Sequence, residues 1–368
     1  MKKVLFLIHD LGQGGAEKVL VNLVNHMDKT KYDVSVISLF GGGVNEQFLN
    51  KDVHYRAVFR KTFPANSQIM KLLTPMQLHR LCVKEDYDIE VSYLEGPSAR
   101  IVSGCENPHT KLVCWIHVEM HTMKKLAYAF RSEKEARWCY SRFQKIICVS
   151  DYVKNDFCNL INARKKSSVL YNTVESDFIR SESKEIAEEI IHDDKTNLIA
   201  VGSLKESKGY ERLFSIVTRL VRENYNIRLY VLGIGPLKEQ LETYIRENEL
   251  EDVIYLLGYK TNPYKYVAQS DLFVCASFAE GFSTAVTESL IVGTPVCTVE
   301  VSGMKELLGN NEYGLVTENT EEALEAGIKR FLDNRELLAL YGEKALIRGE
   351  DFSTEETVKA VEDMLEEL

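Results

Sequence analysis

The chain has 368 residues and a mass of 42.0 kDa, with 45 % hydrophobic and 27 % charged residues. This composition is typical of soluble globular proteins and excludes disordered, collagen-like and coiled-coil classes. At roughly 100–200 residues per domain, the length predicts two domains. The formal net charge of −10 argues against a general nucleic-acid binder.

The charge is unevenly distributed along the chain. Residues 1–175 contain 25 basic and 18 acidic residues, a net charge of +7. Residues 176–368 contain 20 basic and 37 acidic residues, a net charge of −17. This asymmetry predicts that the first half meets an anionic partner, and chance clustering of solvated charge is the alternative.

Two features predict a cytoplasmic protein. None of the 8 cysteines forms a Cys-x-x-Cys pair, and most lie in apolar runs such as 146–149, as expected for buried thiols in a reducing compartment. The apolar start at 4–8 ends at His9-Asp10, which is too short for a signal peptide, and no run is long enough to span a membrane. Peripheral attachment to the inner face of the cell membrane is compatible with these features.

Short apolar runs alternate with helical patterns along the whole chain. In the first half the runs lie at 4–9, 34–39, 53–58, 89–94, 112–117, 146–149 and 168–170, with helical patterns such as 16–26 and 151–160. In the second half the runs lie at 198–202, 228–232, 253–257, 272–276, 295–299 and 314–316, with helices at 209–222 and 236–247. Helical segments at 320–333, 335–348 and 354–368 close the chain.

Continuous apolar strands are typical of parallel sheets that are covered on both faces. Strands alternating with helices indicate right-handed βαβ units. We therefore predict an α/β fold of two doubly wound Rossmann-like domains that face a cleft, with a linker near residues 174–194. Ligands are expected beyond the carboxyl ends of the strands.

The loop at 9–17 follows the first predicted strand and contains Gly14-Gly15. Adjacent glycines let backbone N–H groups approach a phosphate at a helix start, although a tight turn would need the same residues. The loop is not G-x-G-x-x-G, and no acidic residue ends the second strand, so the pattern argues against a dinucleotide site.

Two loops of the second half carry the stronger signals. Lys208 opens a helix after the strand at 198–202, where it could bind a diphosphate or simply be solvated. Glu280 precedes a helix and Glu288 lies eight positions further on, with the amides of 281–284 between them. Amides at a helix start bind anions, and the two carboxylates could hold hydroxyls on either side of a diphosphate. The alternative is a helix cap at Glu280 and one surface glutamate.

Two further candidates lie in the first half. His117 ends the strand at 112–117 and is either a ligand-binding or a structural histidine. A basic set flanks apolar residues and could contact a membrane or a lipid phosphate, or be a solvated surface; it comprises Arg56, Arg60, Lys61, Lys71 and Arg80. We expect no metal site, because Asp86-Tyr87-Asp88 precedes its strand and no histidine-rich ligand set is present.

These segments together resemble the retaining GT-B glycosyltransferases, in particular glycosyltransferase family 4. The resemblance rests on residues 14–17, 171–175, 202–209, the Glu-x7-Glu pattern of 280–288, and 293–296. The chain departs from the family at Ser203, where the family usually has arginine, and at Thr173, where it has glycine.

The resemblance implies transfer of a hexosyl or N-acetylhexosaminyl group, with retention, from a nucleotide-diphosphate donor. UDP is the expected nucleotide, and the acceptor is a hydroxyl of a lipid-linked or polysaccharide substrate in cell-surface glycan synthesis. No metal or other cofactor is implied. Residues 1–175, with a C-terminal helix at 352–368, would form the acceptor domain, and residues 176–351 the nucleotide-sugar domain. A non-catalytic nucleotide-sugar binder and a nucleotide-sugar epimerase are the alternatives.

The resemblance also assigns roles to residues. His117, Lys208 and Glu280 would be catalytic, with Glu280 holding the donor sugar and His117 lying beside that sugar. Lys208 and the segment Gly281, Phe282, Ser283 and Thr284 would bind the diphosphate, Glu288 the ribose, and Gly14 and Gly15 the donor phosphate. Ser203 would stand at the position of the family's diphosphate-binding arginine.

Overall fold

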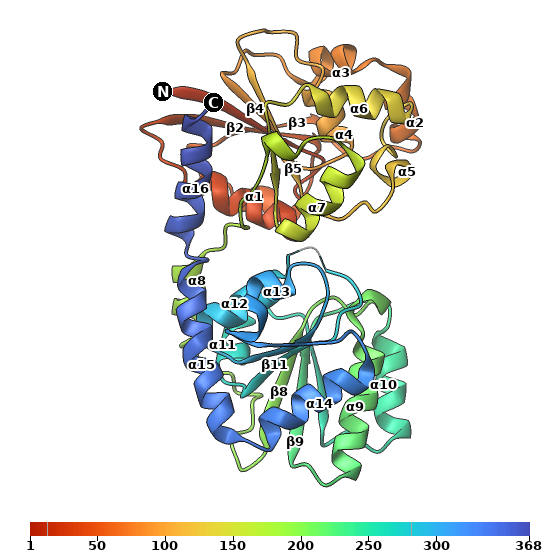
Figure 1. The fold of residues 1–368 in the computed structure, drawn as a ribbon, viewed down its shortest axis with the longest axis vertical. Helices are drawn as coiled ribbons and strands as arrows, with labels where there is room; N and C mark the ends of the chain where they lie inside the picture. The colour runs from red at the N-terminus through yellow and green to blue at the C-terminus, as the bar shows by residue number, and fades with distance from the viewer. Residues whose placement is uncertain (13, 281) are drawn as a thin grey trace. The chain divides into compact units, whose positions relative to one another are not determined.

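The computed structural model describes residues 1–12, 14–280 and 282–368, which form two units (Figure 1). Unit 1 comprises Met1–Val174 and Thr354–Leu368, and unit 2 comprises Glu175–Ser353. The division therefore lies one residue from the expected break at 175/176 and two residues from that at 351/352.

Unit 1 is built on a seven-stranded parallel sheet in the order β3-β2-β1-β4-β5-β6-β7. Its strands are β1 (Lys2–Ile8), β2 (Tyr32–Phe40), β3 (His54–Phe59), β4 (Ile89–Ser92), β5 (Lys111–Ile116), β6 (Lys145–Cys148) and β7 (Ser167–Val169). Its helices are α1 (Gly15–His26), η1 (Val44–Phe48), α2 (Asn66–Leu72), α3 (Pro75–Cys82), α4 (Pro97–Val102), α5 (Met123–Leu126), α6 (Glu133–Ser141), α7 (Asp151–Leu160), η2 (Arg164–Lys166) and α16 (Thr354–Glu366).

Unit 2 contains a six-stranded parallel sheet in the order β10-β9-β8-β11-β12-β13. Its strands are β8 (Thr196–Val201), β9 (Ile227–Leu232), β10 (Ile254–Gly258), β11 (Leu272–Cys275), β12 (Val296–Val299) and β13 (Leu315–Thr317). Its helices are α8 (Ser176–Glu182), η3 (Glu206–Lys208), α9 (Tyr210–Arg222), α10 (Lys238–Glu247), α11 (Tyr264–Ala268), α12 (Thr284–Val292), α13 (Met304–Leu307), η4 (Gly309–Asn311), α14 (Glu321–Leu332) and α15 (Arg335–Glu350).

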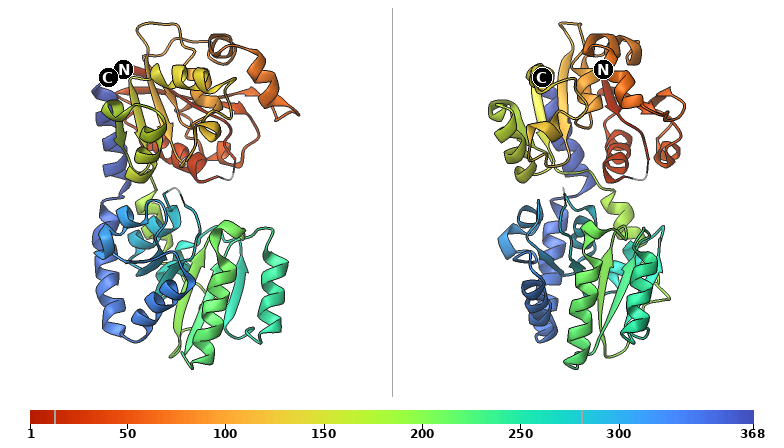
Figure 2. Two further views of the ribbon diagram at one scale, coloured as in Figure 1. Left: turned by 45° about the vertical axis from the view of Figure 1, so that its right-hand side comes forward. Right: turned by 90° about the vertical axis from the view of Figure 1, so that its right-hand side faces the viewer.

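Helices cover both faces of each sheet (Figure 2). Residues 4–8 of β1 are therefore fully buried, and β1 pairs in parallel with β2 on one side and β4 on the other. The prediction of two doubly wound α/β units is confirmed. All eight cysteines are free and buried, which confirms the prediction of buried thiols.

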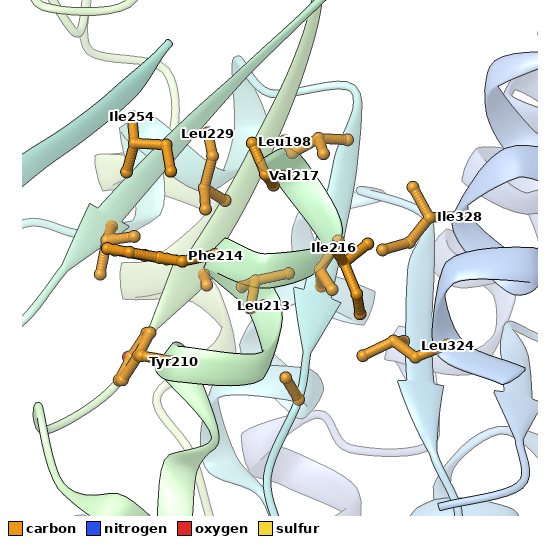
Figure 3. Packing of buried hydrophobic residues seen from close by; sticks show 14 of the residues in the cluster. Leu198, Tyr210, Leu213, Phe214, Ile216, Val217, Leu229, Ile254, Leu324 and Ile328 are labelled. Atoms are coloured by element: carbon orange, nitrogen blue, oxygen red, sulfur yellow. The ribbon is translucent and has the colours of Figure 1, made fainter. Parts of the chain in front are cut away.

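The core of unit 2 is organised by α9 (Figure 3). Leu213, Phe214, Ile216 and Val217 repeat at helical spacing and are fully buried against strands β8 and β9 and helix α14. Each such side chain contributes roughly 1.5–3 kcal/mol when it leaves water. The apolar face thus fixes α9, and with it the loop that connects β8 to α9.

The C-terminal helix α16 belongs to unit 1. Lys2 Nζ donates to the Leu365 carbonyl at 2.9 Å, and the Tyr32 hydroxyl donates to Glu366 Oε1 at 2.9 Å. The two ends of the chain therefore lie side by side in this unit (Figures 1 and 2). Within the described residues, no helix has both the length and the apolar character needed to cross a membrane.

Each sheet has one point where the strand order reverses. In unit 1 it lies between β1 and β4, and in unit 2 between β8 and β11. Loops that leave the carboxyl ends of two such strands turn to opposite faces of the sheet and leave a crevice between them, where doubly wound proteins bind ligands.

Candidate active site

Lys208 and Glu280 meet at the reversal point of unit 2. Lys208 ends η3 after β8, and Glu280 follows the adjacent strand β11. Lys208 Nζ lies 2.6 Å from Glu280 Oε1, and the Ser277 hydroxyl donates to the same oxygen at 2.5 Å. The side chains of Lys208 and Glu280 are 27 % and 10 % exposed, so the pair borders solvent while its surroundings hold it in place.

The loop after β11 is fastened from α9. Arg212 is 7 % exposed; its Nε donates to the Ala276 carbonyl at 2.7 Å, and its Nη2 donates to the Ser277 carbonyl at 2.9 Å. Gly209 has φ +67°, and a Cβ there would lie 2.0 Å from the Ala276 oxygen. Only glycine permits this close approach of the two loops, which brings Lys208 to Glu280.

Helix α12 begins directly after this pair. Ser283 is its N-cap and accepts a hydrogen bond from the Val286 N–H, so the alternative that Glu280 caps the helix is wrong. The Phe282 ring is buried and packs edge-on against Phe352, with ring centroids 5.9 Å apart. Thr284 is the first helical residue. Glu288 lies half-buried one turn further along the helix.

Two other predicted donor-site residues also belong to this region. The Lys208 side chain passes over Gly202, where an added Cβ would lie 3.6 Å from Lys208 Cε. Ser203 directly follows Gly202, the residue that the Lys208 side chain covers, and it is half-buried. The predicted Gly281 lies outside the described residues.

In unit 1 the glycine loop follows β1, at the reversal point. Gly14 is the N-cap of α1, and both Gly14 and Gly15 are exposed. Asp10 fastens the loop, because its Oδ1 accepts from the Gly12 N–H at 2.8 Å. Glu17 folds back over Gly14, and burial raises the pKa of its carboxyl. An anion at this helix start would therefore have a glutamate as its neighbour.

His117 lies at the carboxyl end of β5. It is 7 % exposed, and its ring centroid lies 5.0 Å from that of Tyr93. Burial lowers the pKa of His117 to about 4, and a hydrogen bond to the Tyr93 backbone offsets only part of this effect. The imidazole is therefore neutral at pH 7, and its buried Nε2 has no hydrogen-bond partner among the described residues.

Glu95 is a candidate site residue that the sequence did not reveal. It lies in the turn between β4 and α4, at the same reversal point as the glycine loop, and its Oε2 accepts from the His117 N–H at 3.0 Å. Burial raises the pKa of Glu95. Its position directly after an apolar run is the signal that could have identified it. Ser277 and Arg212 were also missed, because only the fold brings them to Glu280.

The five basic residues predicted to meet the acceptor or a membrane differ in their surroundings. Arg56 donates to the Cys82 carbonyl, and Arg80 forms a 2.7 Å ion pair with Glu106. Arg60 and Lys61 are exposed and follow β3, and Lys71 is half-buried on α2. Arg56 and Arg80 thus have protein partners, although the Arg80 side chain is 71 % exposed, and Arg60, Lys61 and Lys71 border solvent.

Among the described residues, one group has the composition of a metal site. The ligand atoms of His79, Glu90 and Cys105 lie within 4.8 Å of one another. His79 Nε2 and Glu90 Oε2 are 2.8 Å apart, which is a hydrogen-bond distance. Asp86 and Asp88 bind the Asn107 side-chain amide and the Lys3 N–H respectively, in keeping with a structural role.

The fold is that of GT-B glycosyltransferases. The structure of HepE from Anabaena in complex with UDP superposes with a TM-score of 0.80 at 18 % identity, covering 100 % of both chains. The lipopolysaccharide outer core galactosyltransferase WaaB superposes with a TM-score of 0.75 at 17 % identity, again over 100 % of both chains.

The sequence comparisons agree with the fold. The model of Glycosyltransferase Family 4 matches residues 13–178, and that of Glycosyl transferases group 1 matches residues 181–347. One relative from Campylobacter jejuni, N-acetylgalactosamine-N,N'-diacetylbacillosaminyl-diphospho-undecaprenol 4-alpha-N-acetylgalactosaminyltransferase, is 30 % identical over 100 % of both chains. The chain therefore belongs to the family 4 glycosyltransferases of the GT-B type, which confirms the resemblance drawn from its motifs.

Proposed function

We propose that the protein is a retaining glycosyltransferase that moves a hexosyl or N-acetylhexosaminyl group from a UDP-sugar to a hydroxyl of a lipid-linked acceptor. The observation that carries the proposal is the contact of Lys208 with Glu280 at the reversal point of unit 2. A cation and a carboxylate side by side, next to a helix start, suit a ligand that presents both phosphates and sugar hydroxyls.

Lys208 supplies positive charge to the leaving diphosphate. An ammonium group has three N–H donors, and one of them is directed at Glu280. The others can donate to phosphate oxygens, as can the backbone N–H groups at the start of α12. Such preorganised donors stabilise the charge that develops when the bond to the sugar breaks.

Glu280 accepts hydrogen bonds from hydroxyls of the donor sugar in this proposal, and Glu288 from those of the ribose. Ser277 keeps the Glu280 carboxylate in its orientation, because the serine hydroxyl and Lys208 both contact Oε1. The second carboxylate oxygen can then face a ligand. No metal ion takes part in this scheme.

His117 acts as a neutral hydrogen-bonding group at the donor sugar. Because burial keeps the imidazole neutral at pH 7, it can form a hydrogen bond with a sugar hydroxyl without adding positive charge. In this scheme the acceptor hydroxyl attacks on the face from which the diphosphate leaves, which retains the configuration in a single step. A phosphate oxygen of the donor can then take the hydroxyl proton, so the scheme needs no separate base.

Two observations support a lipid-linked acceptor at a membrane. The Campylobacter jejuni relative is named for transfer to a saccharide on diphospho-undecaprenol. In unit 1, α2 exposes Ile69 (48 %) and Leu72 (78 %) next to Lys71, which is a combination that suits an anionic bilayer. Both observations fit a cytoplasmic protein that is attached peripherally to the inner face of the membrane. Such a protein would act in cell-surface glycan synthesis.

Helix α2 is only seven residues long and is fastened at its carboxyl end by two arginines. Arg100 donates to the carbonyls of Met70 and Leu73 at 2.8 and 2.7 Å. Arg131 donates to those of Lys71 and Leu72 at 2.6 Å each. These bonds satisfy carbonyls that a helix end otherwise leaves open, and they hold the apolar side chains outward.

The proposal is tested by transfer to a short-chain polyprenyl diphosphate carrying a disaccharide that ends in N-acetylgalactosamine. UDP- and GDP-sugars are compared as donors, and the anomeric configuration of the product is read by NMR. Lys208→Ala should weaken UDP binding by about ten- to a hundredfold, the usual cost of losing hydrogen bonds to a charged group. Lys238→Ala, on the exposed start of α10, is the matched control.

Three outcomes contradict parts of the proposal. An inverted product refutes retention, and a preference for GDP-sugars refutes the UDP assignment. Nucleotide binding with no transfer to any acceptor favours a non-catalytic binder, for which Ser203 in place of arginine is the supporting feature. Conversion of the nucleotide sugar itself, without an acceptor, favours an epimerase.

A further inference from the structure

The turn at Glu95 lies at the reversal point of unit 1. β1 and β4 are adjacent there, and the Tyr93 N–H, just after β4, donates to the Leu7 carbonyl of β1 at 2.9 Å. A side chain in this turn therefore lies at the crevice where doubly wound units bind ligands. The roles assigned above leave this carboxyl without a function.

The turn holds Glu95 in one place. The Ser92 hydroxyl donates to the Leu94 carbonyl at 2.7 Å, and Glu95 Oε2 accepts from the His117 N–H at 3.0 Å. Gly96 follows with φ +78°, a conformation that favours glycine, and Pro97 begins α4. The turn is thus fixed by the Ser92 bond, and the carboxyl by the backbone N–H of His117, which directly follows β5.

Glu95 is a carboxylate whose hydrogen bonds come from neutral groups. In the described part of the chain these donors are the backbone N–H groups of His117 and of Glu95 itself. Burial raises the pKa of Glu95 and the positive charge of Lys125 slightly offsets this, but the Lys125 Nζ forms its hydrogen bond with the Glu119 carbonyl, at 3.0 Å. Because the residue as a whole is only half-buried, a ligand can approach it. A partly accessible carboxylate with no bound cation is well suited to accept a hydrogen bond from a hydroxyl.

An exposed aromatic ring lies against the same turn. A Cβ on Gly96 would lie 2.6 Å from the Tyr128 hydroxyl, so this ring packs directly over the glycine. Tyr128 is nevertheless 54 % exposed. Partial burial, and to a lesser extent the negative charge of Glu95, raises the pKa of its phenol. A fixed carboxylate beside an open aromatic ring offers a sugar both a hydrogen-bond acceptor and a surface for its apolar C–H face.

We propose that Glu95 and Tyr128 form the subsite of unit 1 that binds the terminal sugar of the acceptor, with Glu95 accepting a hydrogen bond from the reacting hydroxyl. The proposal rests on the transferase function proposed above. The ligand of this subsite is a saccharide with a free hydroxyl. Glu95 and Tyr128 bind the acceptor, whereas Lys208 and Glu280 in unit 2 bind the donor.

Glu95→Gln is the decisive variant, because glutamine keeps an oxygen for the His117 N–H but removes the negative charge. We expect kcat/KM for the disaccharide probe to fall at least tenfold, with the Kd for UDP and the unfolding temperature unchanged. Tyr128→Ala should raise KM for the same probe. Glu85→Gln, an exposed glutamate of the same unit, should match the wild type.

Probe analogues that each lack one hydroxyl of the terminal sugar identify the bond. In the wild type, binding of the probe to immobilised protein in the presence of UDP should weaken when the reacting hydroxyl is removed. In Glu95→Gln that difference should disappear. If the hydroxyl matters equally in both proteins, Glu95 does not contact it and the proposal is overturned.

Binding and turnover together separate this proposal from the proposed function. If Glu95→Gln stays within twofold of the wild type in probe binding and in kcat/KM, the subsite proposal is overturned. The proposed transferase function is not affected by that result. Probe binding that depends on Glu95, without transfer from any nucleotide sugar, supports the subsite and refutes the transferase. A wild-type protein that does not bind the probe overturns the subsite, whatever its donor chemistry.

Discussion

The His79–Glu90 pair makes the stability of unit 1 depend on pH. His79 Nε2 lies 2.8 Å from Glu90 Oε2, and the two side chains are 13 % and 2 % exposed. Burial lowers the pKa of His79, but hydrogen bonds to Cys105 and Glu90 outweigh it and raise the pKa to about 9, from 6.5 in the unfolded chain. The folded unit therefore retains a proton between pH 6.5 and 9 that the unfolded chain releases.

The sign and size of the effect follow from this difference. The stabilisation is fully present below pH 6.5 and is lost as the pH rises through 9. One pH unit corresponds to about 1.4 kcal/mol, so the pair contributes about 3 kcal/mol at pH 6.5. His79→Gln should be less stable than the wild type by about this amount at pH 6.5, and the difference should nearly vanish above pH 9.

Tryptophan fluorescence during urea denaturation measures the effect in unit 1 alone. The chain has 2 tryptophans, Trp115 and Trp138, and both belong to unit 1. His109→Gln, at an exposed position of the same unit, controls for loss of a histidine. Parallel pH profiles for the wild type and His79→Gln, with a constant difference in unfolding free energy, would refute the reasoning.

Three further predictions concern single positions. Gly209→Ala should destabilise unit 2 by at least about 2 kcal/mol, because φ is +67° and the new Cβ would lie 2.0 Å from the Ala276 oxygen; an unchanged midpoint in scanning calorimetry would contradict this. Ser203→Arg should tighten UDP binding severalfold in titration calorimetry if the diphosphate lies near Lys208, and equal or weaker binding would argue against that placement. Leu72→Glu should leave stability unchanged, since the side chain is 78 % exposed, but reduce pelleting with phosphatidylglycerol vesicles about tenfold or more. Equal pelleting would remove α2 from the membrane proposal.

The sequence alone determined the architecture of each unit. Continuous apolar runs such as 4–8 are typical of strands buried on both faces, and their alternation with helical patterns indicates parallel crossovers. Both are properties of short stretches of chain, so they can be read without knowing the fold. The same is true of the Glu280–Glu288 spacing and of the position of Lys208 after a strand.

Only the tertiary structure decided which side chains share a site. Lys208 and Glu280 are 72 positions apart and meet because β8 and β11 are neighbours, which follows from strand order and not from local pattern. Arg212 faces the Ala276 carbonyl for the same reason. The structure also separated the basic residues, since the ion pair that engages Arg80 is made by Glu106, 26 positions away. Contacts of this kind depend on how the strands are ordered and packed. Local patterns in a single sequence do not reveal that order.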